Sequence, residues 1–257
     1  MSSALYVEVS EQIARIQFNR PEVHNALNED MAVQLAAACR DLAADPAVRV
    51  VVLNGSGKAF MAGGDLQALR AQPAEAVNAL IPPVHEAVRL LATMPKPVLA
   101  SVHGAAAGAG MSLMLAADLA LAASYTRFTF AYSDIGTSCD GGMSWSLPRL
   151  VGLRKAMEIA LAGETFDAVE ALRLNLVNRV VDREQLAEAT LELARRLARR
   201  EPHALAHLKR LLRGSSQRDL SAQLDEEHTA FLDCAVRPEF TAAIDAYYAR
   251  RAAREQQ

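Results

Sequence analysis

The 257-residue sequence has few cysteines, no excess of positive charge and no long apolar run. Its three cysteines, Cys39, Cys139 and Cys234, are an odd number without metal-ligand spacing, so we predict neither a disulfide framework nor a metal site. A formal net charge of −3 provides no basic surface for nucleic acid or for an anionic membrane. We therefore expect a small-molecule partner.

The sequence also lacks the signals that direct a chain into or across a membrane. No run approaches the roughly 18 apolar residues of a spanning helix. The first residues lack a charged segment followed by an apolar one. These absences, together with cysteines unsuited to disulfides, predict a cytoplasmic protein without membrane association. Hydrophobic residues make up 51% of the chain, which is ample for a buried core.

Apolar runs separated by helical patterns predict an α/β core with a mostly parallel sheet. Continuous β-branched stretches at residues 48–53 and 98–102 are typical of strands that are buried on both faces. A helix at residues 84–92 is expected to stop at Pro95 and Pro97, and Asn28 is expected to cap an earlier helix. Shorter strands are predicted at residues 5–9, 13–18, 119–122, 128–131 and 177–181.

After about Glu184 only helical patterns remain, at residues 186–200, 203–213, 220–235 and 240–251. We place a boundary near residue 200, which gives a core of residues 1–200 and a C-terminal helical region of residues 201–257. Helices this rich in Ala, Leu and Arg suit packing on a neighbouring subunit as well as on their own core. A homo-oligomer is therefore one expectation.

Two glycine-rich turns each follow an apolar run and lead into a helical pattern, AFMAGGD at residues 59–65 and GAAAGAG at residues 104–110. Small residues let a ligand approach the main chain, and free N–H groups at a helix start carry partial positive charge. Two such turns facing one point would form an oxyanion hole. Taken alone, the second turn suits close helix packing equally well, and it fits a dinucleotide-binding turn poorly because Asp118 comes too early.

Four segments resemble the enoyl-CoA hydratase/isomerase, or crotonase, family: FNRPEVHNALN (18–28), AFMAGGDL (59–66), KPVLASVHG (96–104) and DAVEALRLNLVN (167–178). The match is in register across nearly the whole chain. The resemblance implies a crotonase-type spiral of ββα units, with a C-terminal helical region that builds trimers and often hexamers. It also implies an acyl-CoA thioester as the substrate, with coenzyme A entering as part of the substrate and no further cofactor.

By the same resemblance, the main-chain N–H groups of Gly64 and Ala109 stabilise a thioester enolate. Ala109 replaces a frequent glycine, but the donor is the main chain, so only a negative φ is required there. His24 stands where a basic residue often reaches phosphate, although a solvated loop histidine explains it equally well. The segments against which coenzyme A would lie give the implied substrate-binding residues His24, Ala26, Leu27, Met61, Ala62, Gly63, Asp65 and Leu66.

The acid–base positions decide which reaction is expected. Family hydratases use two glutamates, and Ser112 and Tyr132 occupy those positions here. A hydroxyl cannot replace a carboxylate as base without a partner, so ordinary hydratase activity is not expected. Residues 135–149 are instead similar to a subgroup with an aspartate before the glycines, which includes ring-epoxide and enoyl isomerases. Asp140 fills that position, although Asp-Gly is also a common turn pair.

A lone carboxylate beside an oxyanion hole suits a 1,3-proton shift, so the leading prediction is an acyl-CoA isomerase or related lyase with Asp140 as base and acid. 4-Chlorobenzoyl-CoA dehalogenases also place an aspartate there, as a nucleophile. His85 matches their pocket histidine, and Tyr132 stands where they have an aromatic residue, usually tryptophan. The alternatives are a dehalogenase-like hydrolase, a hydratase with unusual acid–base groups, and a non-catalytic acyl-CoA binder.

Overall fold

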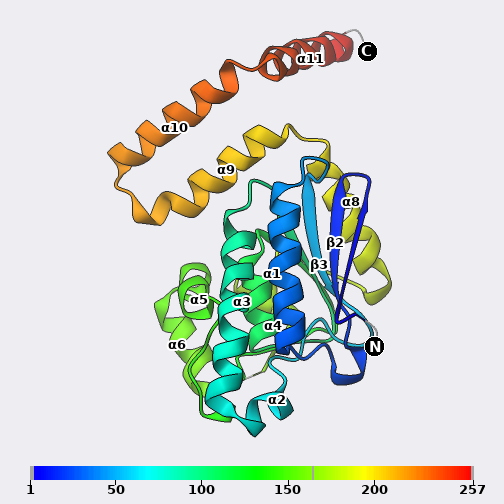
Figure 1. The fold of residues 1–257 in the computed structure, drawn as a ribbon. Helices are drawn as coiled ribbons and strands as arrows, with labels where there is room; N and C mark the ends of the chain where they lie inside the picture. Colours follow the sequence, from blue (N-terminus) through cyan, green and yellow to red (C-terminus); the bar gives the residue numbers. More distant parts are fainter. Residues whose placement is uncertain (1–2, 164, 256–257) are drawn as a thin grey trace. The chain divides into compact units, whose positions relative to one another are not determined.

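Apolar runs form strands and amphipathic stretches form helices over residues 3–163 and 165–255, the part of the chain that the computed structural model describes (Figure 1). The chain divides into two units, Met1–Arg199 and Arg200–Gln257. The strands are β1 (Leu5–Ser10), β2 (Ile13–Phe18), β3 (Val50–Gly55), β4 (Val98–Val102), β5 (Ala105–Ala107), β6 (Leu119–Ala123), β7 (Arg127–Thr129), β8 (Phe166–Asp167) and β9 (Arg179–Val181). The α-helices are α1 (Glu29–Ala44), α2 (Leu66–Ala71), α3 (Pro73–Thr93), α4 (Ala109–Ala116), α5 (Met143–Val151), α6 (Leu153–Ala162), α7 (Ala168–Arg173), α8 (Leu186–Ala198), α9 (Pro202–Gly214), α10 (Leu220–Ala235) and α11 (Pro238–Glu255). Short 3₁₀ helices are η1 (Pro21–Val23), η2 (Ser133–Ile135), η3 (Arg183–Gln185) and η4 (Ser215–Gln217).

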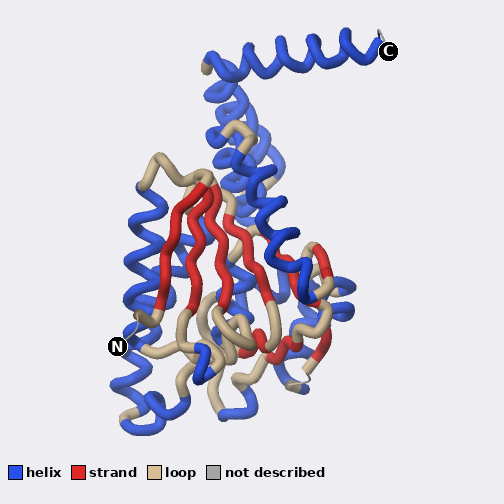
Figure 2. Tube along the Cα trace, turned by 90° about the vertical axis from the view of Figure 1, so that its right-hand side faces the viewer, coloured by secondary structure: helices blue, strands red, loops and turns tan. Residues whose placement is uncertain are grey.

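A six-stranded sheet forms the centre of the first unit, in the order β1-β2-β3-β4-β6-β9. β1 and β2 pair antiparallel, whereas the pairs β2–β3, β3–β4, β4–β6 and β6–β9 are parallel. Helices cover both faces of this sheet (Figure 2). A second sheet of three short strands has the order β5-β7-β8. The mixed sheet with its helical layers confirms the predicted α/β class.

Strand β3 shows why the sequence has continuous β-branched runs. Val51 and Leu53 belong to the main core cluster, which includes side chains of α1, α3 and α4. Val50 and Val52 belong to a second cluster, which includes side chains of α8. Because successive side chains of a strand point to opposite faces, a strand covered on both faces needs apolar residues at every position.

Helix α3 is longer than predicted. It begins at Pro73, so the expected helix at residues 84–92 is only its C-terminal part. Pro82 and Pro83 lie inside it, and Pro82 is exposed, so water can satisfy the carbonyl groups that lose an N–H partner. The helix ends at Thr93, two residues before Pro95, as predicted.

The second unit is helical. α10 turns back alongside α9, and α11 follows it (Figure 1). Each of the helices predicted from about residue 203 onward is present. Asp219 caps α10 by accepting a hydrogen bond from the Ala222 N–H. Among the described residues of the whole chain, no helix combines the length and the apolar character that a bilayer crossing requires.

Candidate active site

The two glycine-rich turns lie side by side. Met61 in the first turn donates its N–H to the Ala105 oxygen at 3.1 Å and accepts a hydrogen bond from the Ala107 N–H at 3.0 Å. These bonds form a parallel bridge between Met61 and Ala106. The turns meet because they follow β3 and β4, neighbouring parallel strands whose carboxyl ends lie at the same edge of the sheet.

Glycine is required where the turns approach each other. A Cβ on Gly110 would stand 2.3 Å from the main-chain oxygen of Met61, so only glycine lets the start of α4 pack against the first turn. Gly108 has a φ of 48°, a conformation that side chains disfavour, and it directs the chain into α4. Close packing and the aiming of main-chain donors therefore depend on the same residues.

Two main-chain N–H groups at this junction, those of Gly64 and Ala109, have no acceptor among the described residues. Leu27 donates to the Gly63 oxygen at 2.8 Å and accepts from the Asp65 N–H at 2.9 Å, so the Gly64 N–H points away from Leu27. Ala109 opens α4, and an N–H in the first helical turn has no acceptor inside the helix. Each group is available to a negatively charged oxygen.

A carboxylate lies close to the start of α4. Tyr132 donates its hydroxyl hydrogen to Asp140 Oδ1, and Tyr132 Oη lies 2.9 Å from Ser112 Oγ. Ser112 Oγ also donates to the main-chain oxygen of Asp140 at 3.1 Å. Ser112 follows Ala109 by less than one helical turn, about 4.5 Å along the helix axis. These contacts connect the half-buried Asp140 to α4, the helix that Ala109 opens.

Tyr132 is a donor rather than a base in this arrangement. Its side chain is 7% exposed. Burial, followed by the charge of Asp140 and the hydrogen bond to it, raises the pKa of Tyr132 well above its ordinary value. The hydroxyl therefore stays protonated and can orient the Asp140 carboxylate, and even less of it is ionised at neutral pH than of an ordinary tyrosine.

His85 reaches the same loop from α3. Its Nε2 accepts a hydrogen bond from the Gly141 N–H at 3.3 Å, so the ring lies against the residue that follows Asp140. The ring is half-buried. The structure thus brings together Asp140 and the two residues suggested by the likeness to dehalogenases, His85 and Tyr132.

Arg20 and Asn25 organise the loop before α1, and no sequence motif singled out either residue. Arg20 Nη2 lies 2.9 Å from Asp65 Oδ2, and Arg20 Nη1 donates to the Ala26 oxygen at 2.6 Å. Asn25 is fully buried and donates to the Ala59 oxygen at 2.8 Å. Its φ of 59° is one that asparagine adopts more readily than most residues. Both side chains tie this loop to the first glycine-rich turn.

The residues predicted to bind substrate differ in what they can present to a ligand. His24, Ala62 and Leu66 are exposed. The side chains of Leu27 and Met61 are buried in the main core, at 1% and 0% exposure, so they can meet a ligand only through main-chain atoms. Of the remaining positions in the two segments, Gly63 is buried and the half-buried ones are Ala26, Gly64 and Asp65.

A cavity of about 290 Å³ lies beside the first turn, between α2, α3 and the start of α1. Leu69 and Leu80 give it an apolar wall. Glu29, Asp65 and Glu75 also line it, and their carboxyl groups disfavour phosphate groups. The phosphates of a nucleotide-like ligand are therefore not expected in this cavity.

Replacing Asp65 by asparagine should destabilise the first unit. Burial alone would raise the pKa of Asp65, but hydrogen bonds from Arg20 and from the Ala68 N–H outweigh burial and lower that pKa. Asparagine still caps a helix, so the variant removes mainly the ion pair. We expect the free energy of unfolding in urea at neutral pH to fall by about 1.5–3 kcal/mol.

The pH dependence of the stability difference between wild type and Asp65→Asn checks this prediction. A lowered carboxyl pKa stabilises the fold above the unfolded pKa of about 4, and this contribution is lost as the pH falls through the folded value. The difference between wild type and Asp65→Asn should therefore shrink in acid. Glu8→Gln, which removes an exposed ion pair with Arg15, should change stability little at any pH. A difference that persists undiminished in acid would rule out the ion pair as its cause.

Comparison with known proteins identifies the family. The model of the family described as enoyl-CoA hydratase/isomerase matches residues 8–257. The chain belongs to the enoyl-CoA hydratase/isomerase family. It is 33% identical over 255 residues to a 1,2-epoxyphenylacetyl-CoA isomerase of Escherichia coli (strain K12), and the match covers 98% of this chain and 97% of the relative.

Two further relatives in the enoyl-CoA hydratase/isomerase family have different activities in their names. A 4-chlorobenzoyl coenzyme A dehalogenase-2 of Arthrobacter sp is 36% identical over 218 residues, 82% of this chain and 78% of the relative. The crystal structure of an enoyl-CoA hydratase from Polaromonas sp. JS666 superposes with a TM-score of 0.91 at 35% identity, covering 96% of this chain and 97% of the other.

These matches confirm the family resemblance, and the structural match confirms the crotonase fold. The chain is therefore an enzyme of the enoyl-CoA hydratase/isomerase family. The relatives carry the names isomerase, dehalogenase and hydratase. Similarity to these relatives thus identifies the family, and the reaction has to be inferred from the side chains around Asp140.

Proposed function

We propose that the chain is an acyl-CoA isomerase in which Asp140 is the single acid and base. The Asp140 carboxylate removes a proton from an acyl carbon, and the electron pair delocalises onto the thioester oxygen, which the N–H groups of Gly64 and Ala109 hold. The protonated Asp140 then returns the proton to a second carbon, and the double bond shifts. Atoms and electrons balance within the substrate, so the reaction uses no cofactor beyond the coenzyme A that the substrate carries.

The observation that carries this proposal is the hydrogen bond from Tyr132 to the Asp140 carboxylate, beside the first turn of α4. It orients one carboxylate, and Tyr132 in turn contacts Ser112 on the helix that Ala109 opens. Hydration needs a second acid–base group, and the raised pKa of Tyr132 makes its hydroxyl unsuited to act as the base. The match to an isomerase over 98% of the chain supports the same assignment.

Incubation with enoyl-, epoxyacyl- and haloaryl-CoA thioesters in deuterium oxide tests the proposal. We expect an enoyl- or epoxyacyl-CoA to give a product of unchanged composition, as followed by mass spectrometry, with deuterium at the accepting carbon only to the extent that protonated Asp140 exchanges with solvent before it returns the proton. A product that has gained one water would make the enzyme a hydratase. Binding without turnover of any thioester would make it a non-catalytic binder. Either result contradicts the isomerase.

A dehalogenase-like hydrolase is the second candidate, and the contact of His85 with Gly141 favours it. In that reaction Asp140 would attack the ring carbon that carries the halogen, a carbon–oxygen bond would form and halide would leave. Water would then hydrolyse the aryl ester at the Asp140 carbonyl and regenerate the carboxylate. A single turnover in water labelled with oxygen-18 would place the label in the Asp140 carboxylate. The proton shift of the isomerase uses no water and would leave Asp140 unlabelled.

We propose that the segments around residues 24–27 and 61–66 hold the coenzyme A part of the substrate. The exposure of His24 supports this, because an exposed imidazole is accessible to a phosphate group. The ion pair between Arg20 and Asp65 keeps the two segments together. His24→Ala should therefore raise KM more than it lowers kcat.

We also propose a homotrimer or a pair of trimers. In the second unit, many large apolar side chains are exposed to solvent. Exposed apolar surface of this kind marks an interaction site, and we assign it to contact with further copies of the chain. They include Leu208, Leu212, Leu220, Leu224, Phe231, Leu232 and Val236. Sedimentation should give three or six times the chain mass of 27.7 kDa. A monomer at micromolar concentration would contradict the proposal.

A cytoplasmic location is part of the proposal. Cys39, Cys139 and Cys234 are free thiols, and Cys39 is buried. Burial, followed by the charge of Glu86, raises the pKa of Cys39 to about 12, so that thiol is unreactive. Free thiols suit a reducing compartment. Fractionation of the native cells should find the protein with cytoplasmic markers.

A further inference from the structure

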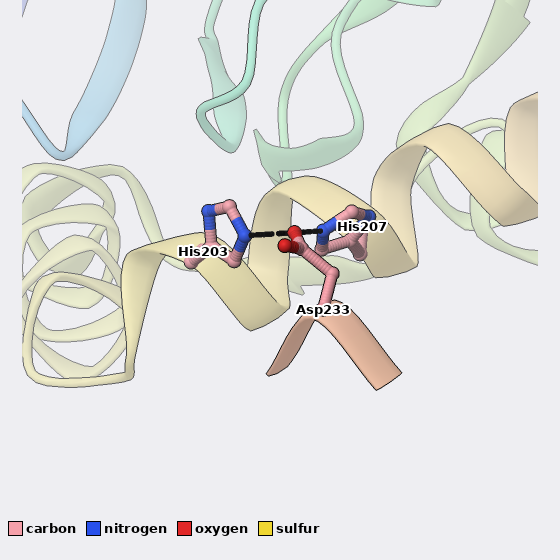
Figure 3. A group of neighbouring side chains, drawn as sticks. All are labelled: His203, His207 and Asp233. Carbon is pink, nitrogen blue, oxygen red and sulfur yellow. Dashed lines mark hydrogen bonds and ion pairs between the residues drawn. The ribbon is translucent and has the colours of Figure 1, made fainter. Parts of the chain in front are cut away.

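Two histidines and an aspartate meet between α9 and α10 in the second unit. His203 and His207 are four residues apart on α9, so they share one face of the helix. Asp233 projects from α10 toward them (Figure 3). The three ligand atoms lie within 4.8 Å of one another.

The distances in this group are short. Asp233 Oδ2 lies 2.5 Å from His203 Nε2 and 2.8 Å from His207 Nε2. The two Nε2 atoms lie 3.2 Å apart. To bond the carboxylate, each Nε2 must carry a hydrogen, which places two N–H donors against each other. A hydrogen-bond arrangement therefore leaves an unfavourable contact between the two rings.

A metal cation removes that conflict. A tetrahedral Zn²⁺ with bonds of about 2.0–2.1 Å to nitrogen places two nitrogen ligands about 3.3 Å apart, close to the observed separation of the Nε2 atoms. Each imidazole then offers a lone pair in place of an N–H. The Asp233 oxygen has to retreat by less than about 1 Å to reach a similar spacing. Its side chain is 47% exposed, so it has room to turn.

The surroundings are compatible with a bound cation. Asp233 presents one carboxylate oxygen to both rings, so the group supplies an anionic ligand beside the two imidazole nitrogens. Arg210 Nη2 lies 3.4 Å from His207 Nδ1 and would have to release that contact, because a metal-bound imidazole carries its hydrogen on Nδ1. Arg210 keeps its ion pair with Glu226.

The location indicates what a bound ion would do. In the described part of the second unit, Ala230 is the only buried side chain. A bridge from α9 to α10 would therefore hold together a helix pair that lacks a core of its own. Partly exposed ligands leave a further coordination position to water.

We propose that His203, His207 and Asp233 form a binding site for a divalent transition metal of the zinc class, which clips α9 to α10. Imidazole nitrogens suit zinc and its neighbours, whereas magnesium and calcium prefer oxygen ligands. The spacing of the three cysteines predicted no metal site. The histidine pair was a visible signal, but Asp233 comes from a separate helix.

The test is titration of the full-length chain, purified without a histidine tag and stripped with a chelator, with Zn²⁺ alone. We expect one equivalent to bind with a Kd in the micromolar range or below, by calorimetry or against a chromophoric chelator. His203→Ala, His207→Ala and Asp233→Asn should each weaken binding at least about tenfold. His228→Ala is the matched control, because His228 is an exposed histidine on α10 outside the cluster, and it should bind like wild type.

Two readouts keep the result independent of folding failure. Far-UV circular dichroism of each variant reports whether the helices form. Co²⁺ in place of Zn²⁺ should show the intense visible bands of a low-coordinate site in wild type and lose them in His203→Ala. Failure of wild type to bind one equivalent, or equal binding by folded His203→Ala and His207→Ala, would overturn the site. Loss of binding in His228→Ala would overturn the assignment of its ligands.

Discussion

Asparagine at position 140 is expected to remove nearly all turnover while acyl-CoA still binds. The kcat should fall by about 10²–10⁴-fold, the contribution of a positioned acid–base group. The amide can accept the hydrogen bond from Tyr132 but cannot take a proton from carbon. The Kd for an unreactive acyl-CoA, measured by calorimetry, should stay within about threefold of wild type because Asp140 contributes to the reaction step rather than to ground-state binding.

Asp134→Asn is the matched control, because Asp134 is an exposed carboxylate in η2 of the same loop. It should retain full activity. Tyr132→Phe keeps the ring in the core and removes the hydroxyl, so we expect a smaller loss in kcat that reflects a less well oriented carboxylate. Wild-type turnover by Asp140→Asn would leave the proposed mechanism without its base.

Proline at position 109 is expected to have the second-largest effect, because it removes one proposed oxyanion donor. Ala109 is the first residue of α4, where proline fits well. The φ and ψ of Gly108, 48° and −116°, lie near the mirror image of the extended region that is preferred before proline, and glycine without a Cβ adopts either hand. We expect kcat to fall by about 10²–10³-fold.

Ala109→Gly keeps the N–H and should keep the rate. The proline ring also occupies the position of the lost hydrogen, so the Kd for the same unreactive acyl-CoA is measured alongside kcat to separate lost binding from lost rate. Circular dichroism and the urea midpoint establish that both variants fold. A near wild-type kcat in Ala109→Pro would remove the second turn from the mechanism.

The fold was predictable where the residue pattern of a segment reflects how that segment is buried. The β-branched run of β3 is apolar at successive positions because both of its faces are covered, and that requirement is visible in the sequence. The N-terminal half of α3 was missed because Pro82 and Pro83 suggest a break, which exposure to water makes tolerable. Strand β5 was missed because three alanines carry no strand signal.

The candidate active site likewise has one part that the sequence could predict and one part that it could not. The glycine-rich turns are predictable because a tight approach demands glycine at the position itself, as at Gly110. The contacts that give the turns a neighbouring carboxylate are not local. Ser112 meets the Asp140 main-chain oxygen across 28 positions, and Arg20 meets Asp65 across 45 positions. Such pairs depend on the packed fold, which no short motif encodes.

A crystal structure of the full chain with an unreactive acyl-CoA tests the central claim most directly. We predict that the thioester oxygen lies about 2.7–3.1 Å from the nitrogen atoms of both Gly64 and Ala109. The Asp140 carboxylate should face the acyl carbon that loses its proton and keep its hydrogen bond from Tyr132. A thioester oxygen that contacts neither N–H, or an Asp140 carboxylate turned to solvent, would contradict the account.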